Sequence, residues 1–256
     1  MALLETKQLS VHFGGVVAVD RLDMAIEPGE ILGLIGPNGA GKTTTLNLLS
    51  GYLLPSHGRL HFKGQDITGL QPHEVASLGL VRTFQKSAVF GDVTVLENLI
   101  IATHLHSRSS LFEILTRNGS FQRREKAAEE KAKELLCFFG LWEKRDQLAR
   151  HLSYGERRLL ELAISLAPDP DLILLDEPAA GMNPEEGARL ADLIRLLREK
   201  GLTILLVEHH MDLIMSVSDR IIVLNHGVKI AEGEPSEVQC NKDVIDAYLG
   251  GVAFDA

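Results

Sequence analysis

The chain has 256 residues, with 26 Lys and Arg against 35 Asp and Glu, so that its formal net charge is −9. Hydrophobic residues make up 45% of the chain, which excludes wholesale disorder, and the acidic balance argues against general nucleic-acid binding. The longest apolar runs are strand-sized, well below the roughly 18 residues that a membrane span needs, and no secretory signal is recognisable. Two cysteines cannot form a disulfide framework or a Cys-based metal site, and Cys137, beside two phenylalanines, is expected to be buried. We therefore expect a cytosolic protein with one large domain or two small ones.

Short β-rich runs alternate with helical patterns, which predicts an α/β fold with a mostly parallel sheet and helices on its faces. In chain order the expected elements are a strand at 31–35, a helix at 43–54, a strand at 172–175, a helix at 184–200, a strand at 203–207, and an antiparallel hairpin made by 220–224 and 229–232. The middle section has few β-rich runs and includes a helical pattern at 121–139. We expect a helical subdomain at 93–167, inserted between core segments 1–92 and 168–235, and a helical tail at 236–256.

A glycine-rich motif directly follows the first expected buried strand and directly precedes the first expected helix. Its residues match G-x-x-x-x-G-K-[ST] and are Gly36, Pro37, Asn38, Gly39, Ala40, Gly41, Lys42 and Thr43. The glycines let the backbone turn so that successive N–H groups point at phosphate oxygens, and the helix adds its positive N-terminal end. We expect Lys42 to pair with the β- and γ-phosphates of a nucleotide and the Thr43 hydroxyl to bind Mg²⁺.

Two adjacent acids, Asp176 and Glu177, follow the apolar strand at 172–175. An acid at the end of such a strand can bind the Mg²⁺ of a nucleotide held by a phosphate-binding loop. The acid next to it can polarise the attacking water. Because two buried carboxylates are costly without a metal or donors nearby, the pair indicates ATP hydrolysis rather than nucleotide storage.

A third motif, His151-Leu152-Ser153-Tyr154-Gly155-Glu156-Arg157-Arg158, begins a helical pattern. Ser153 suits an N-cap, and Gly155 is expected to leave backbone N–H groups accessible to an anion. Together with the other two motifs, this segment resembles the LSGGQ signature of ABC-transporter ATPases, with Tyr154 in place of the usual glycine. The resemblance covers the chain from about residue 4 to residue 249.

The resemblance implies the ABC ATPase fold, in which a P-loop NTPase core carries an N-terminal antiparallel β portion and an inserted helical subdomain. It assigns Gln85 to Mg²⁺ and the attacking water, His209 to the γ-phosphate, Thr44 to the nucleotide and Phe13 to the adenine ring. A phenylalanine in the core is the alternative for Phe13. Asn183 stands where an aspartate is common, which leaves the hydrogen bonding across a dimer open.

The resemblance also implies a mechanism in which two subunits pack head to tail. Each ATP then lies between the P-loop of one subunit and Ser153 and Gly155 of the other, with Glu177 as general base. The second subunit is either a copy of this chain or a paralogous ATPase. Because this chain has no membrane span, the expected partners are separate multi-span permease subunits at the inner face of the plasma membrane, and indirectly an extracytoplasmic solute-binding protein. Nucleic acid is not an expected partner.

Several stretches resemble the ATPases that power import of branched-chain amino acids: 79–85, 94–98, the segment after Thr103, 176–184 and 247–250. Importers of urea or other amides use similar ATPases and are the alternative for the solute. A soluble ABC ATPase that acts on ribosomes or DNA, and a catalytically dead regulatory subunit, remain as other classes. Intact Lys42, Asp176, Glu177 and His209 argue against the dead subunit.

Overall fold

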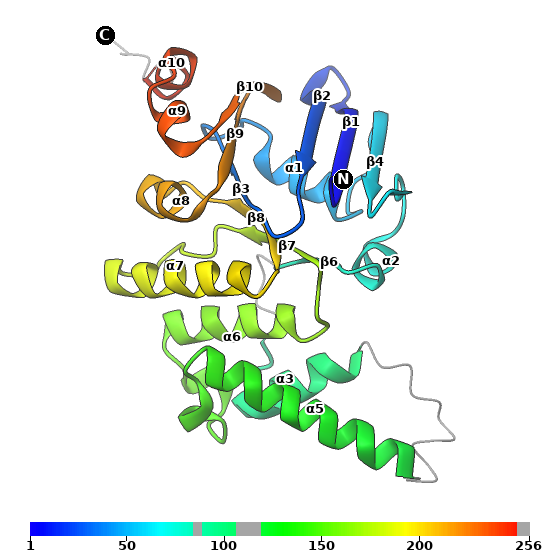
Figure 1. The fold of residues 1–256 in the computed structure, drawn as a ribbon, viewed down its shortest axis with the longest axis vertical. Helices are drawn as coiled ribbons and strands as arrows, with labels where there is room; N and C mark the ends of the chain where they lie inside the picture. The colour runs from blue at the N-terminus through cyan, green and yellow to red at the C-terminus, as the bar shows by residue number, and fades with distance from the viewer. Residues whose placement is uncertain (84–88, 106–118, 250–256) are drawn as a thin grey trace. The chain divides into compact units, whose positions relative to one another are not determined.

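The structure is a computed structural model that describes residues 1–83, 89–105 and 119–249 (Figure 1). The chain divides into two compact units. The core unit comprises Met1–Arg82, Asp171–Ala180 and Gly187–Ala256, and the helical unit comprises Thr83–Pro170 and Gly181–Glu186. Each unit has elements and packing of its own and is described by itself.

The core unit contains two sheets, and their strands are β1 Leu4–Phe13, β2 Val16–Ile26, β3 Ile31–Ile35, β4 His57–Phe62, β5 Gln65–Asp66, β6 Leu80–Arg82, β7 Leu172–Asp176, β8 Thr203–Val207, β9 Arg220–Asn225 and β10 Val228–Gly233. The four-stranded sheet has the order β2-β1-β4-β5 and is antiparallel. The six-stranded sheet has the order β10-β9-β3-β8-β7-β6 and is parallel except for the β9–β10 hairpin. The predicted mostly parallel sheet and the N-terminal antiparallel portion are therefore confirmed.

The central strands of the larger sheet are apolar because both of their faces are covered. Every residue of β3, β7 and β8 is buried. On one face, helix α1 (Lys42–Leu49) contacts β7 of the larger sheet and β2 of the smaller one (Figure 1). Its residues Leu46 and Leu49 belong to a core cluster that includes side chains from both sheets. The helix that follows the glycine-rich loop is thus anchored in the apolar core of this unit.

The other helices that lie wholly in the core unit are α2 Pro72–Ser77, α8 Met211–Val217, α9 Pro235–Gln239 and α10 Lys242–Leu249. Helix α7 spans Pro184–Glu199, and its residues from Gly187 onward belong to the core unit. Helix α8 packs closely on β3 at Gly33. A Cβ added there would lie 2.9 Å from Ser218 Oγ and 3.0 Å from Ile214 Cγ1. The absence of a side chain at Gly33 therefore sets how near the helix comes to the strand.

The helical unit is built from α3 Val95–Leu105, α5 Gly119–Phe138, η1 Trp142–Lys144, η2 Ala149–His151 and α6 Tyr154–Leu166. Helices α3, α5 and α6 contact one another pairwise. Leu99, Leu136 and Leu160 are each fully buried where they pack. In the part of the chain that the structure describes, no helix is both long and apolar enough to cross a membrane.

Two expectations about local structure were wrong. The first helix, predicted at 43–54, ends at Leu49, because the Ser50 hydroxyl donates to the carbonyl of Leu46 and Gly51 turns the chain with a φ of +75°. Cys137 is exposed rather than buried. Leu136 lies on the buried side of α5 and Phe139, directly after the helix, is buried as well, whereas Cys137 lies outside that apolar stripe.

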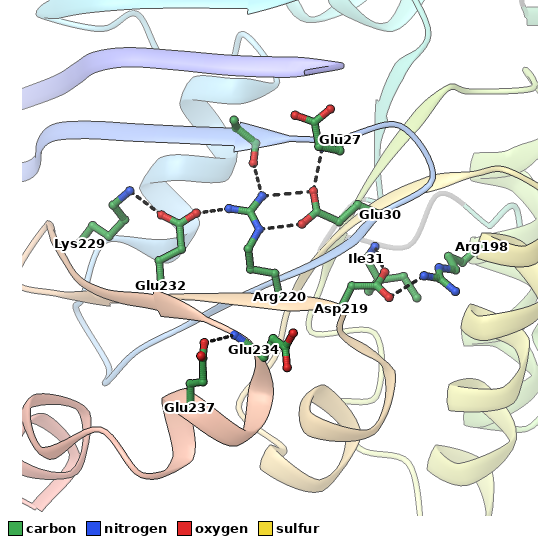
Figure 2. A network of polar contacts seen from close by, with 11 residues as sticks. Glu27, Glu30, Ile31, Arg198, Asp219, Arg220, Lys229, Glu232, Glu234 and Glu237 are labelled. Atoms are coloured by element: carbon green, nitrogen blue, oxygen red, sulfur yellow. Dashed lines mark hydrogen bonds and ion pairs between the residues drawn. The ribbon is translucent and has the colours of Figure 1, made fainter. Parts of the chain in front are cut away.

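A network of charged side chains ties β9 to β2, to the turn before β3 and to β10 (Figure 2). The Arg220 guanidinium donates to both carboxylate oxygens of Glu30, at 2.8 and 3.2 Å, and to the carbonyl of Ala25 at 2.6 Å. It also donates to Glu232, which accepts from Lys229 Nζ at 2.6 Å. The hydrogen bond to Glu30 is the main reason that the pKa of Arg220 lies above its usual value, although burial opposes it.

Replacement of Arg220 by methionine is expected to lower the free energy of unfolding by about 1–3 kcal/mol, because Glu30 and Glu232 lose their cationic partner in a partly buried setting. Arg59→Met is the matched control, since Arg59 pairs with Asp66 at an exposed site and its loss should lower the free energy of unfolding by less than the loss of Arg220. Urea denaturation of both variants measures the difference. Equal losses in the two variants would show that the network contributes no more than a surface ion pair.

Candidate functional site

Three neighbouring strands of the parallel sheet, β3, β8 and β7, each end at a group of residues that the sequence singles out. The glycine-rich loop follows β3, His209 follows β8, and Asp176 is the last residue of β7 with Glu177 next to it. The carboxyl ends of parallel strands meet at one edge of a sheet, where ligands bind in open α/β folds. The core unit therefore gathers three of the predicted groups at one edge.

The glycine-rich loop leads into α1, whose first turn has neither a side-chain N-cap hydrogen bond nor an acidic residue. The N-cap is Gly41, at a φ of +101°, and a Cβ there would lie 2.6 Å from the carbonyl oxygen of Ala18. A Cβ on Gly36 would lie 2.1 Å from the carbonyl oxygen of Leu224. Glycine is thus required at both ends of the loop, and the first N–H groups of the helix remain suited to an anion.

Lys42 is buried and is held against its own loop. Its ammonium donates to the carbonyl oxygens of Gly36 at 2.7 Å and Pro37 at 3.0 Å. Burial lowers the pKa of Lys42, and the carboxylates of Glu177 and Asp176 oppose that effect. This arrangement fits a phosphate ligand, which would provide the ammonium with stronger, charged acceptors than the two carbonyls.

Asp176 forms a buried ion pair that the sequence analysis missed. The Arg82 guanidinium, at the end of β6, donates to Asp176 Oδ2 at 2.9 Å and to Asn47 Oδ1 at 2.6 Å. The side chains of Arg82 and Asp176 are 10% and 2% exposed. The pair joins the last residues of the adjacent parallel strands β6 and β7, and through Asn47 it also contacts α1. The sequence signal for the pair was Arg82 itself, a charged residue at the end of an apolar strand.

Glu177 and His209 come together at the same edge. His209 Nδ1 lies 3.7 Å from Glu177 Oε1, and both side chains are about half exposed. Glu177 has a φ of +48°, a left-handed conformation that is sparsely populated by non-glycine residues and is found at active sites and switches. Between His209 and β8 stands Glu208, a buried acid that the sequence analysis left without a role.

The residues at this edge fit magnesium nucleotide. The loop and the start of α1 present backbone N–H groups and an ammonium, the donors that phosphate oxygens accept. The exposed Thr43 and the buried Asp176 offer hydroxyl and carboxylate oxygens, which are the ligands that Mg²⁺ prefers. Thr44, next to Thr43 in the first turn of α1, is half-buried.

The signature-like motif belongs to the helical unit, at the start of α6. Ser153 is the N-cap, as predicted. Its hydroxyl accepts from the N–H of Glu156 at 3.3 Å, and Glu156 accepts from the N–H of Ser153 at 3.1 Å. Burial alone would raise the pKa of Glu156, but hydrogen bonds from Lys144 and Ser153 outweigh it, so that this pKa lies below its usual value. The helix start is firmly capped.

Gly155, the second residue of the motif expected to bind an anion, is itself buried. A Cβ on Gly155 would lie 2.3 Å from Glu186 Oε1, so the glycine makes room for this carboxylate. Glu186 Oε2 in turn accepts from the N–H of Asn183 at 3.1 Å, and Asn183 Oδ1 accepts from the N–H of Glu186 at 2.9 Å. An amide oxygen caps a helix as well as a carboxylate does, so Asn183 keeps a capping function.

Of the remaining predicted site residues, Phe13 belongs to the described part of the chain and Gln85 does not. Phe13 ends β1, and its 51% exposed fraction excludes the alternative of a core phenylalanine. Tyr248 of α10 was not singled out as a site residue, yet burial raises its pKa and a hydrogen bond with the backbone of Gly36 partly opposes this rise. The C-terminal helix thus reaches the first residue of the glycine-rich loop.

Known proteins similar to this chain agree with the geometry. The ABC transporter family model matches residues 19–180, and the model of the branched-chain amino acid ATP-binding cassette transporter family matches residues 228–253. The chain is 43% identical to the high-affinity branched-chain amino acid transport ATP-binding protein LivG of Escherichia coli (strain K12), over 97% of this chain and 98% of LivG. It is 38% identical to a probable LivG of Archaeoglobus fulgidus, over 98% of this chain and 96% of that protein.

Solved structures give the same fold. The ADP conformation of MJ1267, an ATP-binding cassette of an ABC transporter, aligns with a TM-score of 0.85 at 33% identity, covering 98% of this chain and 99% of MJ1267. A nucleotide-free ATP-binding cassette aligns with a TM-score of 0.83 at 32% identity, covering 97% and 99% of the two chains.

Proposed function

This chain belongs to the ABC transporter family of ATP-binding proteins, and on that premise we propose that it binds and hydrolyses ATP to power import of branched-chain amino acids. The single observation that carries the proposal is the edge where β3, β7 and β8 end, with Lys42 in its loop and His209 Nδ1 3.7 Å from Glu177 Oε1. These groups provide phosphate binding, proton acceptance and charge stabilisation, which are the requirements of phosphoryl transfer to water.

The loop from Gly36 to Thr43 binds the phosphates of ATP, with Thr44 adding to the helix N-terminus and Phe13 against the adenine ring. Lys42 leaves the carbonyls of Gly36 and Pro37 and pairs with the β- and γ-phosphates. Thr43, Asp176 and Gln85 would hold Mg²⁺, which would neutralise phosphate charge.

Glu177 is the general base of the reaction. It accepts a proton from water as the water oxygen bonds to the γ-phosphorus and the bond to the β–γ bridging oxygen breaks. His209 contacts the γ-phosphate and Lys42 stabilises the charge on the departing ADP. Catalysis comes mainly from positioning and from charges that are oriented before the reaction begins.

Ser153 and Gly155 act on ATP bound to a second subunit in a head-to-tail dimer. The capped start of α6 supplies their N–H and hydroxyl donors. Because Glu186 lies against Gly155, phosphate binding there requires this carboxylate to turn away. The second subunit is a copy of this chain or a paralogous ATPase.

The transport partners are multi-span permease subunits, through which the chain sits at the inner face of the plasma membrane, and indirectly an extracytoplasmic solute-binding protein. LivG of Escherichia coli and BraF of Pseudomonas aeruginosa, at 43% and 42% identity, are high-affinity branched-chain amino acid transport ATP-binding proteins, which supports branched-chain amino acids as the solute. The solute itself contacts the permeases and the binding protein. An importer of urea or other amides is the alternative that the test below separates.

The test is recovery of partners from native membranes with Glu177→Gln as bait in the presence of MgATP, followed by mass spectrometry. We expect two multi-span permeases, with or without a second ATPase. Uptake of labelled leucine and of labelled urea by cells that carry or lack the identified permeases then assigns the solute. Lys42→Ala is the control bait, because it should not retain ATP. Recovery of ribosomal or DNA-repair proteins without a membrane protein would overturn the transport proposal.

A further inference from the structure

Glu208 is a buried acid that directly follows β8. It stands between Val207, the last residue of that strand, and the exposed His209. Glu208 is 1% exposed and its side chain is 0% exposed. A carboxylate so completely removed from water is costly unless donors surround it. Nothing in the reaction described above uses Glu208, so its burial needs another physical reason.

The carboxylate of Glu208 accepts hydrogen bonds from two separate backbone segments. Its Oε1 accepts from the N–H of Ala179 at 2.8 Å. Its Oε2 accepts from the N–H of His209 at 3.1 Å and of His210 at 3.4 Å, and His210 Nδ1 lies 3.1 Å from the same oxygen. One oxygen therefore faces the turn after β7 and the other faces the turn after β8.

These two turns carry the general base and the histidine. Ala179 follows Glu177 by two residues, and Glu177 itself holds a left-handed conformation with a φ of +48°. The N–H of Glu177 also donates to the carbonyl of Val207 at 2.9 Å, which is a second connection between the chain segments at the ends of β7 and β8. The side chains of the same two segments approach each other where His209 Nδ1 lies 3.7 Å from Glu177 Oε1.

We propose that Glu208 is a positioning residue that sets the placement of Glu177 relative to His209, a proposal that rests on the proposed ATPase function. The carboxylate acts through the backbone N–H groups of Ala179, His209 and His210 and does not touch the nucleotide. Both turns contribute a group to the same reaction, and a displacement of about 1 Å between them costs up to about 100-fold in rate.

A metal centre is the rival role for this cluster. Among the described residues, Glu208, His209 and His210 have ligand atoms within 4.8 Å of one another. However, Glu208 Oε2, the oxygen near the histidine rings, already accepts from the N–H groups of His209 and His210, and the Glu208 side chain is 0% exposed, so this oxygen has little capacity left for an ion. The hydrogen bonds therefore favour a positioning role.

The test compares Glu208→Gln with wild type in the full chain. An amide keeps the shape of the side chain but presents a donor to one of the two turns, so one connection is lost. We expect kcat for ATP to fall about 10- to 100-fold, with KM changed by less than about threefold. Amide exchange in the nucleotide-free protein, resolved by residue with NMR, should accelerate at least about tenfold at Ala179 or at His209 and His210, and remain slow in β7 and β8.

Glu199→Gln is the matched control, since Glu199 is exposed at the end of α7 and the charge change is the same. Glu208→Asp keeps the charge but shortens the reach, so it should also lower kcat, and it replaces Glu208→Gln if that variant does not fold. A kcat within twofold of wild type, or unchanged exchange at the three amides, would overturn the proposal. Faster exchange throughout β7 and β8 with unchanged kcat per folded molecule would also overturn it, in favour of a merely structural role. An inactive wild type would refute the ATPase function instead, while the exchange measurement still tests the hydrogen bonds.

Discussion

The Glu177→Gln variant is expected to hydrolyse ATP about 10²- to 10⁴-fold more slowly than wild type and to bind ATP with unchanged affinity. An amide oxygen cannot take the proton from the attacking water, whereas the Lys42 loop that binds the phosphates is left intact. Glu177 follows β7 in a left-handed conformation, and this backbone is unaffected by the change from carboxylate to amide. The loss should therefore appear in kcat and not in binding.

Single-turnover phosphate release and calorimetric titration with ATP measure the two quantities separately. Glu185→Gln is the control for removal of one negative charge nearby in sequence, because Glu185 is exposed in the first turn of α7. It should hydrolyse ATP within about twofold of the wild-type rate. If Glu177→Gln kept more than a tenth of the wild-type rate, Glu177 would not be the general base.

The Arg82→Met variant is expected to lose about 3–5 kcal/mol of unfolding free energy in the absence of nucleotide. The Asp176 side chain is only 2% exposed, so removal of the guanidinium takes a close ion pair away from a buried carboxylate. Asn47 loses the donor at 2.6 Å from its Oδ1 as well. The expected loss exceeds that of Arg220→Met because the Arg82 pair is more deeply buried.

Chemical denaturation in EDTA measures the loss, and a double-mutant cycle assigns it to the pair. Asp176→Asn removes the buried charge, so Arg82→Met in that background should cost at least about 2 kcal/mol less than in wild type. Equal costs in both backgrounds would contradict the ion pair as the cause. Only free energies of unfolding are compared in this cycle. ATPase activity is not compared, because Asp176 is also a proposed Mg²⁺ ligand.

The sequence predicted the features that depend on neighbouring residues. The strand at 31–35 and the strand at 203–207 match β3 and β8, because a strand covered on both faces must be apolar at every position. The glycine-rich loop was recognised from its spacing, since its glycines and Lys42 act within one short stretch of chain. Ser153 was correctly predicted as an N-cap because its partner, Glu156, is three residues away.

Element ends and exposure were less predictable. The first helix continued past Leu49 in the prediction because its apolar periodicity does not stop there, whereas the turn at Gly51 stops it in the structure. Nothing in the sequence indicated that Glu186, 31 residues farther along the chain, lies against Gly155. In each case a residue from another part of the chain, or a backbone turn, decided the outcome.

By itself the sequence determined the α/β fold, the glycine-rich loop, the acid pair Asp176 and Glu177 and the family to which the chain belongs, because each depends on short-range order along the chain. Only the tertiary structure decided the partners of the buried charges. Arg82 meets Asp176 across 94 positions of sequence, and Glu208 accepts from Ala179 across 29. The physical reason is that a buried charge is stabilised by whichever donors the fold brings within about 3 Å, and parallel strands bring together residues that the sequence keeps far apart.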